Sequence, residues 1–483
     1  MKKIHKYISI VLAAMFLTMS TVTLISAQDS TLVVQDSVVA VAQEAAPVAQ
    51  PETAAIVPTV DAGDTAWMIV AAAFVLMMTI PGLAFFYGGL VRQKNVLNIM
   101  MQSIILTAVI TVQWVIFGYS LAFSSSTGPL APFIGGFDWA FLKGIGVSDL
   151  SPYFISHSQP TADGGTIGTI PHMIFILFQG MFAIITPALI IGAFAERIKF
   201  GGFLLFSVLW ATFVYDPVAH WVWSGDVLLF KMGALDFAGG TVVHVNAGVA
   251  ALVMAIMIGK RKNYKGHAIP PHNIPFVVLG TALLWVGWIG FNAGSGLAAD
   301  GLAASAFLAT HLATATSAAT WALLDYIFNK KPTVVGIATG AVAGLVAITP
   351  AAGFVGVTGA LLIGLIVAVL CFIMVGYVKG KLGYDDTLDA FGVHGVGGIW
   401  GAIATGLFAT PAIQSYSGLF YGNAGQLVTQ LIATGVTIVY SGVLTFVLFK
   451  IVDKLVGIKA TPKEESVGLD LTQHKEVAYT AID

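Results

Sequence analysis

The sequence predicts an all-α polytopic membrane protein with eleven transmembrane helices, arranged as a five-plus-five inverted repeat and a final eleventh helix. Three observations predict this class. The chain is 57% hydrophobic and only 10% charged, whereas an ordinary soluble domain is roughly 25% charged. Its apolar residues form long segments, and a helix needs about 17–25 of them to cross a bilayer. Its 53 glycines favour close helix packing in lipid. A soluble protein is excluded, and the net charge of −2 indicates no nucleic-acid partner.

The two ends of the chain differ from the apolar middle. Residues 1–27 are predicted to be a cleaved signal peptide, because three lysines precede an apolar run that ends in small residues. An uncleaved first span is the alternative. Residues 28–60 are rich in Ala, Val, Gln, Glu and Pro and predict a flexible exported segment. The membrane domain is then expected over 61–455, and a cytoplasmic tail over 456–483.

Eleven apolar segments follow the exported segment, with one large extramembrane loop at 124–168. The predicted spans are 66–90, 96–123, 169–194, 200–221, 237–258, 275–291, 302–328, 333–350, 354–377, 391–408 and 427–452. With the mature N-terminus outside and the sides alternating, only Lys143 and Lys231 among the basic residues of the span connections fall outside. This positive-inside asymmetry predicts a multi-pass protein of the cytoplasmic membrane with its C-terminus in the cytoplasm.

Two histidines at matched spacing are the first candidate functional residues. Asp236 precedes His244 by eight residues, and Asp386 precedes His394 by the same interval. Each imidazole then lies about 12 Å along its helix, at about 1.5 Å per residue. The fifth and tenth spans run in opposite directions in an inverted repeat, so the rings are expected to meet. Ionisable groups at membrane depth are usually functional; the alternative is two unrelated core histidines.

Other chemistries have weaker support in the sequence. Two imidazoles without further ligands at the right spacing rarely hold a metal, so neither a metal nor another cofactor is expected. No nucleophile motif is present, which predicts a protein that is not an enzyme. Asp236 stands at the start of a predicted helix, where it either caps the backbone amides or contributes to a cation site. Phe291 and Ser295 end the sixth span, and aromatic rings can bind a cation through their faces.

Four motifs resemble those of the ammonium transporter family (Amt/Mep/Rh), and the resemblance covers residues 64–480. The motifs are Asp236-Phe-Ala-Gly-Gly-Thr-Val-Val-His244, Gly290-Phe291-Asn-Ala-Gly-Ser295, Ala195-Glu196-Arg-Ile-Lys-Phe200 and Phe391-Gly-Val-His394-Gly. The resemblance implies a bacterial Amt-type subunit, assembled as a homotrimer with one pore through each subunit.

The resemblance also implies roles for individual residues. By position, Phe182, Trp223 and Ser295 match the outer ammonium-recruiting site, and Phe182 with Phe291 matches the ring pair that gates the pore. The same resemblance makes His244 and His394 the paired pore histidines, and gives Asp236 a role that is at least partly structural.

The tail at 464–476 resembles the cytoplasmic tail that couples subunits in this family. A PII-type signal protein docks on that side in bacterial members. Lys475 departs from the family pattern, which has glycine after the histidine.

The predicted function is therefore transport of ammonium or ammonia, with methylammonium as an analogue. Ammonium would be recruited at the aromatic and serine site and deprotonated, and ammonia would pass the two histidines. Two alternatives stay open. One is an ammonium sensor that acts through a tail-bound PII-type protein. The other is a pore for another small neutral solute such as urea or carbon dioxide.

Overall fold

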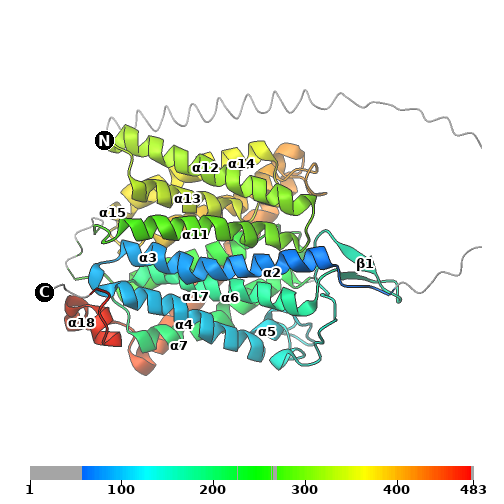
Figure 1. The fold of residues 1–483 in the computed structure, drawn as a ribbon, viewed down its shortest axis with the longest axis horizontal. Coiled ribbons are helices and arrows are strands. Elements are labelled where there is room, and N and C mark those ends of the chain that lie inside the picture. The colour runs from blue at the N-terminus through cyan, green and yellow to red at the C-terminus, as the bar shows by residue number, and fades with distance from the viewer. Residues whose placement is uncertain (1–56, 226, 263, 265–268, 480–483) are drawn as a thin grey trace, which may run out of the picture. The chain divides into compact units, whose positions relative to one another are not determined.

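A computed structural model describes residues 57–479, apart from residues 226, 263 and 265–268. The predicted signal peptide and nearly all of the predicted exported segment 28–60 lie outside the described residues. The described chain is mostly helical, and its long helices lie side by side (Figure 1).

The first half of the helical chain supplies five long apolar segments. They are Ala62–Leu90 (α2 Ala62–Met77, η2 Met78–Leu83, α3 Ala84–Leu90), Gln93–Phe123 (η3 Gln93–Asn95, α4 Val96–Gln113, η4 Trp114–Gly118, α5 Tyr119–Phe123), His172–Phe194 (α6), Phe200–Lys231 (α7 Phe200–Trp210, η6 Ala211–Tyr215, α8 Asp216–Trp223, α9 Leu228–Lys231) and Gly240–Ile258 (η7 Gly240–Val245, α10 Asn246–Ile258).

The second half supplies five more, together with a shorter helix. The five are Ile274–Gly296 (α11 Ile274–Ala293, η8 Gly294–Gly296), Gly301–Asn329 (α12), Val357–Leu382 (α14 Val357–Ile373, η9 Met374–Val378, α15 Lys379–Leu382), Phe391–Phe408 (η10 Phe391–Gly395, α16 Val396–Phe408) and Ala424–Val456 (α17). Ten helical segments of the described chain are thus long and apolar enough to cross a membrane.

The predicted span 333–350 coincides with the shorter helix, α13 (Val334–Ile348), which has 15 residues. At about 1.5 Å per residue it is roughly 22 Å long, less than a hydrocarbon core of about 30 Å. The helix ends two residues before Pro350, because proline and the residue before it do not continue a helix. The described chain is therefore a helical polytopic membrane protein with about ten candidate spans.

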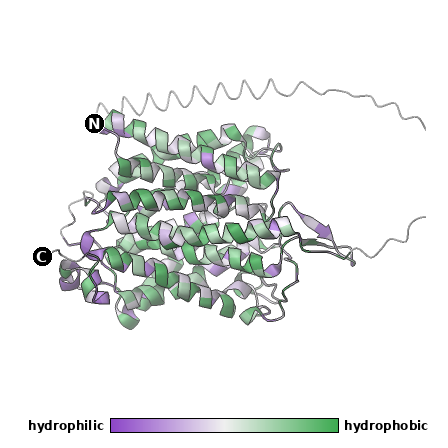
Figure 2. Ribbon diagram, in the orientation of Figure 1, coloured by the Kyte–Doolittle hydropathy of each residue, from purple (hydrophilic) through white to green (hydrophobic). Residues whose placement is uncertain are grey.

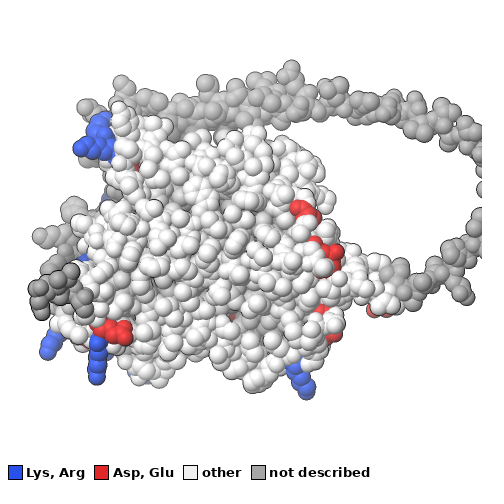
Figure 3. All heavy atoms as spheres, in the orientation of Figure 1, with Lys and Arg blue, Asp and Glu red and all other residues white. Residues whose placement is uncertain are grey.

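The predicted loop 124–168 contains η5 (Ala140–Leu142) and a small antiparallel hairpin, β1 (Ser158–Pro160) and β2 (Thr166–Gly168). The hairpin projects from one end of the helices, and α18 (Pro462–Val467) lies at the other end (Figure 1). We refer to these as the hairpin end and the tail end. Apolar residues follow the helix lengths and polar residues gather toward both ends (Figure 2). On the face shown in Figure 3, most Lys and Arg side chains lie toward the tail end.

The tail end is held by a buried charge network. The carboxylate of Glu196 accepts hydrogen bonds from the backbone N–H and Nε of Arg92, at 2.7 and 2.8 Å, and from Nη1 of Arg261 at 3.2 Å. Burial alone would raise the pKa of Glu196, but the Arg92 hydrogen bond and the two guanidinium charges hold it below its ordinary value. Arg261 also pairs with Asp385 at 2.8 Å. The network ties together loops that are distant in the sequence.

The predicted tail lies against this end of the helices. Oδ1 of Asp470, in η12 (Asp470–His474), accepts the Asn98 backbone N–H at 2.8 Å, and the Leu469 N–H donates to Oδ1 of Asn95 at 2.9 Å. Lys475 ends η12 with φ +59°, the left-handed region that favours glycine. This chain thus has lysine, where the family pattern has glycine, at a position whose backbone conformation glycine would adopt more easily.

A glycine contact fixes how closely the two histidine-bearing segments approach. A Cβ added to Gly248 in α10 would lie 2.2 Å from the backbone N of Gly395, at the end of η10. Small residues at such crossings allow backbones to touch. The glycine thus sets the separation of the segments that carry His244 and His394.

We expect Gly248→Ala to destabilise the protein by about 1–3 kcal/mol, because the added methyl group has to force two backbones apart. The thermal midpoint of the detergent-purified protein measures this. Gly435→Ala in α17 is the matched control, since a Cβ there meets nothing within 4 Å. Replacing that helical glycine should be neutral or stabilising. Equal midpoints for the two variants would contradict the close-approach interpretation.

Candidate functional site

The two predicted histidines meet inside the protein. His244 lies in η7 and His394 in η10, and their Nδ1 atoms are 3.3 Å apart. The rings are nearly parallel, with centroids 5.4 Å apart and an interplanar angle of 17°. Both residues are buried. One Nδ1 has to donate and the other accept, so the two imidazoles share a single proton at this contact. The sequence spacing predicted this approach, although it predicted ordinary helices where both histidines lie in π-helical turns.

Each histidine segment begins with an aspartate that caps it. The buried carboxylate of Asp236 accepts four backbone N–H groups, from Gly239 and Gly240 on Oδ1 and from Thr241 and Val242 on Oδ2, at 2.6–3.0 Å. Such bonds satisfy the free amides of a helix start and favour a negative charge there. In the structure, Asp236 thus caps the backbone amides at the start of the segment that carries His244.

Asp386 plays the same part before His394. Its carboxylate accepts the backbone N–H groups of Ala390 at 3.0 Å and of Phe391 at 2.8 Å. The equal spacing of aspartate and histidine in the two segments therefore corresponds to equal local geometry. In both segments an aspartate caps the first turn, and the histidine that follows it lies at the buried contact between the two segments.

The predicted aromatic residues form one connected group. The rings of Phe182 in α6 and Phe291 in α11 have centroids 4.3 Å apart, and the Trp223 ring stands at 88° to Phe182 at 5.8 Å. The Trp223 Nε1–H donates to the Asp236 carbonyl at 2.9 Å, which joins this group to the cap of the first histidine segment. Ser295, one helical turn after Phe291, donates its Oγ–H to the Phe291 carbonyl at 2.8 Å.

Sequence reasoning missed Trp288, which lies against the first histidine. Its ring is nearly parallel to that of His244, at 5.3 Å and 19°, and it also contacts Phe291 at 5.3 Å. The Nε1–H donates to Oγ1 of Thr349 at 2.8 Å, which fixes the ring plane. Its position three residues before Phe291, on the same face of α11, is a signal that could have indicated it.

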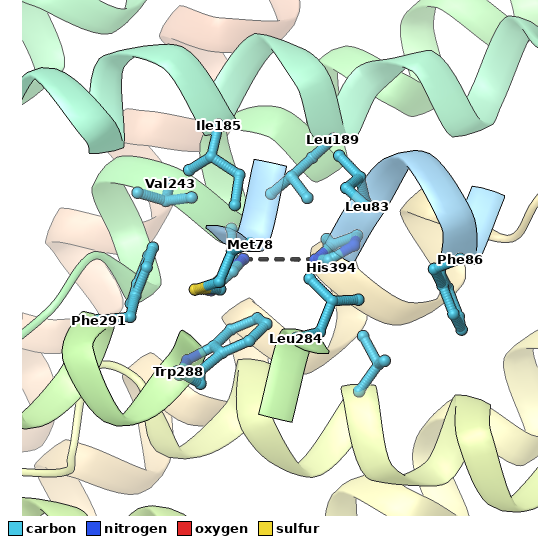
Figure 4. Close-up of a pocket in the computed structure, with 12 residues that line it drawn as sticks. Met78, Leu83, Phe86, Ile185, Leu189, Val243, Leu284, Trp288, Phe291 and His394 are labelled. Atoms are coloured by element: carbon cyan, nitrogen blue, oxygen red, sulfur yellow. Dashed lines mark hydrogen bonds between the residues drawn. The ribbon is translucent and has the colours of Figure 1, made fainter. Parts of the chain in front are cut away.

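A narrow cavity of about 10 Å³, roughly the space that one water molecule needs, is lined by both histidines and by the rings of Trp288 and Phe291. Figure 4 shows His394 with its dashed hydrogen bond, among aliphatic and aromatic side chains that come from several helices. The lining residues are Met78, Leu83, Phe86, Ile185, Leu189, Val243, His244, Leu284, Trp288, Phe291, Val342 and His394. Apart from the imidazoles and one indole N–H, these side chains offer no hydrogen bonds. The cavity suits a small neutral molecule better than a hydrated ion.

A second, more polar chamber of about 130 Å³ also reaches His394. Its lining includes Arg261, Tyr264, Lys379 and Asp389, and His394 lines both spaces. Among the residues that the structure describes, no group of three or more His, Cys, Asp or Glu is placed to hold a metal ion.

The hairpin is attached close to the aromatic group by His157. Its Nδ1 lies 2.9 Å from Oδ2 of Asp64 in α2, and its Nε2 lies 3.9 Å from Oδ2 of Asp300. The neighbouring Ser156 donates to the carbonyl of Gly296, the residue after Ser295, at 3.5 Å. The hydrogen bond to Asp64 raises the pKa of His157, against a smaller opposing effect of burial.

We expect the hairpin to be held more firmly at acidic pH. Because the pKa of His157 is raised in the folded protein, its stabilising contribution is complete below the unfolded value of about 6.5 and is lost as the pH rises through the folded value. The side chain is 44% exposed, so the contribution should stay below about 1 kcal/mol. Hydrogen exchange of the amides at 158–168 measures it. His157→Gln should remove the pH dependence; if that variant keeps it, another group is responsible.

Comparison with known proteins identifies the family. A sequence profile of the Ammonium Transporter Family matches residues 66–479. An ammonium transporter of Bacillus subtilis is 52% identical over 419 residues, which are 86% of this chain and 98% of that protein. The ammonium transporter Amt1 of Archaeoglobus fulgidus is 43% identical, over 86% of this chain and 99% of that protein.

Solved structures agree with the sequence relatives. The crystal structure of Mep2 from Candida albicans superposes with a TM-score of 0.76 at 35% identity, over 87% of this chain and 91% of that one. A protein described as a sensor Amt protein superposes with a TM-score of 0.75 at 29% identity, over 85% of this chain and 98% of that one. Sequence, fold and motifs together show that this chain belongs to the ammonium transporter family.

Proposed function

We propose that the protein transports ammonium across the cytoplasmic membrane by binding the ion at the aromatic group, removing a proton and conducting ammonia past the two histidines. The observation that carries this proposal is the pair of buried imidazoles, hydrogen-bonded to each other in an apolar cavity behind two contacting phenyl rings. The similarity to ammonium transporters of Bacillus subtilis and Archaeoglobus fulgidus supports the substrate.

Phe182, Trp223 and Ser295 recruit the ion in this proposal. The faces of the two rings attract a cation without a fixed negative charge. The Ser295 hydroxyl donates its hydrogen to the Phe291 carbonyl. The hydroxyl oxygen can therefore accept a hydrogen bond from the ion. Ammonium can donate that bond, whereas potassium, a cation of similar size, cannot. Both carboxylate oxygens of Asp236 accept backbone amides, so we assign this residue to the shape of the entrance.

Phe182 and Phe291 form the gate. With their centroids 4.3 Å apart, they leave no room for a hydrated ion, and carrying a bare ion into the apolar cavity is costly. Transfer of one proton from the ion to water on the outer side of the gate leaves neutral ammonia and hydronium, and so removes that cost. Ammonia then accepts and donates hydrogen bonds along His244 and His394. The Nε2 atom of His244 has no hydrogen-bond partner within the described part of the chain, which supports its use by a passing molecule.

The proposal extends to topology and assembly. We count α13 as the eighth of eleven spans, in five-plus-five inverted repeats with the eleventh helix last. We place the hairpin end outside and the tail end in the cytoplasm, as the predominance of basic residues at the tail end supports. The functional unit would be a homotrimer, with a possible PII-type protein on the cytoplasmic face; the name of the sensor Amt neighbour supports such a partner.

Uptake of labelled methylammonium by a strain that lacks its own ammonium uptake tests the proposal. The protein should raise uptake well above an empty vector, and excess ammonium should suppress that uptake. Labelled urea should enter at the background rate, because the entrance selects a cation. Urea influx without methylammonium influx would favour a pore for neutral solutes. Absence of both fluxes from protein that reaches the membrane would leave the sensor alternative.

A further inference from the structure

The inner chamber beside His394 contains an ion pair that the proposed pathway does not use. The Lys379 ammonium group at the start of α15 contacts Oδ1 of Asp389, and its Nζ lies 3.2 Å from the Asp386 carbonyl oxygen. Lys379 and Asp389 both line the chamber that His394 also lines. Their side chains are 12% and 23% exposed, so the pair is largely buried but still reachable by solvent.

Lys379 contacts two acceptors, the Asp386 carbonyl oxygen and the Asp389 carboxylate, which could hold another cation in its place. The carboxylate of Asp386 accepts backbone N–H groups. The lysine therefore contacts the backbone carbonyl oxygen of this residue and not its side chain. Asp389 has φ +60°, a left-handed conformation that few residues other than glycine, asparagine and aspartate adopt readily. An uncommon backbone conformation thus places a carboxylate on the wall of the chamber, two residues before η10.

The group that these acceptors bind is a primary ammonium. Lysine carries a compact charge with three N–H donors, and ammonium presents the same donors with one more. A carboxylate and a carbonyl that hold the lysine group therefore offer charge and hydrogen-bond acceptors that also suit ammonium or methylammonium. The lysine acts as a tethered stand-in for such an ion at this position.

We propose that the Asp389 carboxylate and the Asp386 carbonyl form an inner binding site for ammonium and short alkylammonium ions, which the Lys379 side chain occupies until an ion displaces it. The site would hold the product of transport, an inference that rests on the proposed function. Ammonia that has passed His394 takes a proton from a hydronium ion in the chamber, leaving water, and the resulting ammonium exchanges with the lysine before release.

Chemical rescue in the detergent-purified full chain tests the site without measuring transport. Lys379→Ala removes the tethered group and leaves the two acceptors uncompensated. Its thermal midpoint should fall, and ammonium or methylammonium chloride should then raise it by at least about 2 °C more than sodium or tetramethylammonium chloride at equal ionic strength. Lys381→Ala, two residues further along the same helix and exposed, is the matched control and should show no such preference.

The carboxylate is tested in the same assay. Lys379→Ala combined with Asp389→Asn keeps a residue that tolerates the left-handed backbone but removes the charge, and it should lose the rescue. Lys379→Ala combined with Asp389→Gly should behave identically, which separates the carboxylate from the backbone conformation. A midpoint that responds equally to all four salts, or a rescue that survives in both double variants, would overturn the proposal.

A measurement on the wild-type chain does not depend on whether the variants fold. Acylation of Lys379 by an amine-reactive reagent, quantified by mass spectrometry relative to Lys381 in the same sample, should increase severalfold with methylammonium in place of sodium, and the ratio to Lys381 corrects for reagent that the free amine consumes. An unchanged ratio over the whole concentration range would count against displacement. Methylammonium uptake is scored separately, so a protein that transports without rescue refutes only the inner site, and rescue without transport refutes only the proposed function.

Discussion

Asp236→Ala is expected to abolish the folded entrance and with it all transport. The carboxylate accepts four buried backbone amides, and each buried donor left without a partner costs about 1–3 kcal/mol. Even with partial relaxation, the expected loss is at least about 4 kcal/mol, a large share of the stability of a typical domain. The fraction of detergent-extracted protein that elutes as a single species, and its thermal midpoint, measure this loss.

Two comparisons sharpen the Asp236 experiment. Asp236→Asn keeps one acceptor oxygen but turns an NH₂ group toward amides that also donate, so its midpoint should fall between those of the wild type and the alanine variant. Asp163→Ala, in the exposed hairpin turn, should leave the midpoint unchanged. If Asp236→Ala retained a normal midpoint and lost only ammonium affinity, the residue would be a cation ligand and the capping interpretation would be wrong.

The sequence was most informative where a pattern repeats. Equal aspartate-to-histidine spacing predicted that His244 and His394 approach each other. The rise per residue gives the depth of each histidine, and opposite directions of entry bring the two depths together. The extents of the long apolar segments were also predictable from hydropathy. The π-helical turns around both histidines were not, since they depend on how neighbouring helices pack.

The short helix α13 shows what the local apolar pattern does not reveal. The apolar pattern runs through residue 350, but the helix ends at Ile348 and the chain turns. The Pro350 carbonyl accepts the Phe237 backbone N–H at 3.2 Å, beside the Asp236 cap. The end of one helix thus supports the start of another that is distant in the sequence. The ion pair of Lys379 and Asp389 was missed for a related reason, because both residues look like ordinary polar flanks of a span.

His394→Leu is expected to lower ammonium-evoked current at least about tenfold. Leucine fills similar space in the apolar cavity, and volume-conserving replacements in a core usually cost less than about 1.5 kcal/mol. The protein should therefore fold, while His244 loses the ring with which it shares a proton. Without that pair the cavity offers a passing ammonia only the single imidazole of His244, because the Trp288 Nε1–H already donates to Thr349. Currents from proteoliposomes on a solid-supported membrane measure the effect.

The two histidines should act as a unit. His244→Leu should lose as much current as His394→Leu, and the double variant should lose little more than either, because removing one ring already breaks the shared hydrogen bond. His311→Leu, at an exposed position in α12 whose ring contacts Trp285, is the matched control and should retain the current. Potassium should evoke no current in the wild type. Wild-type currents and unchanged selectivity in both single variants would show that the imidazoles are structural, and the conduction route would have to be sought elsewhere in the bundle.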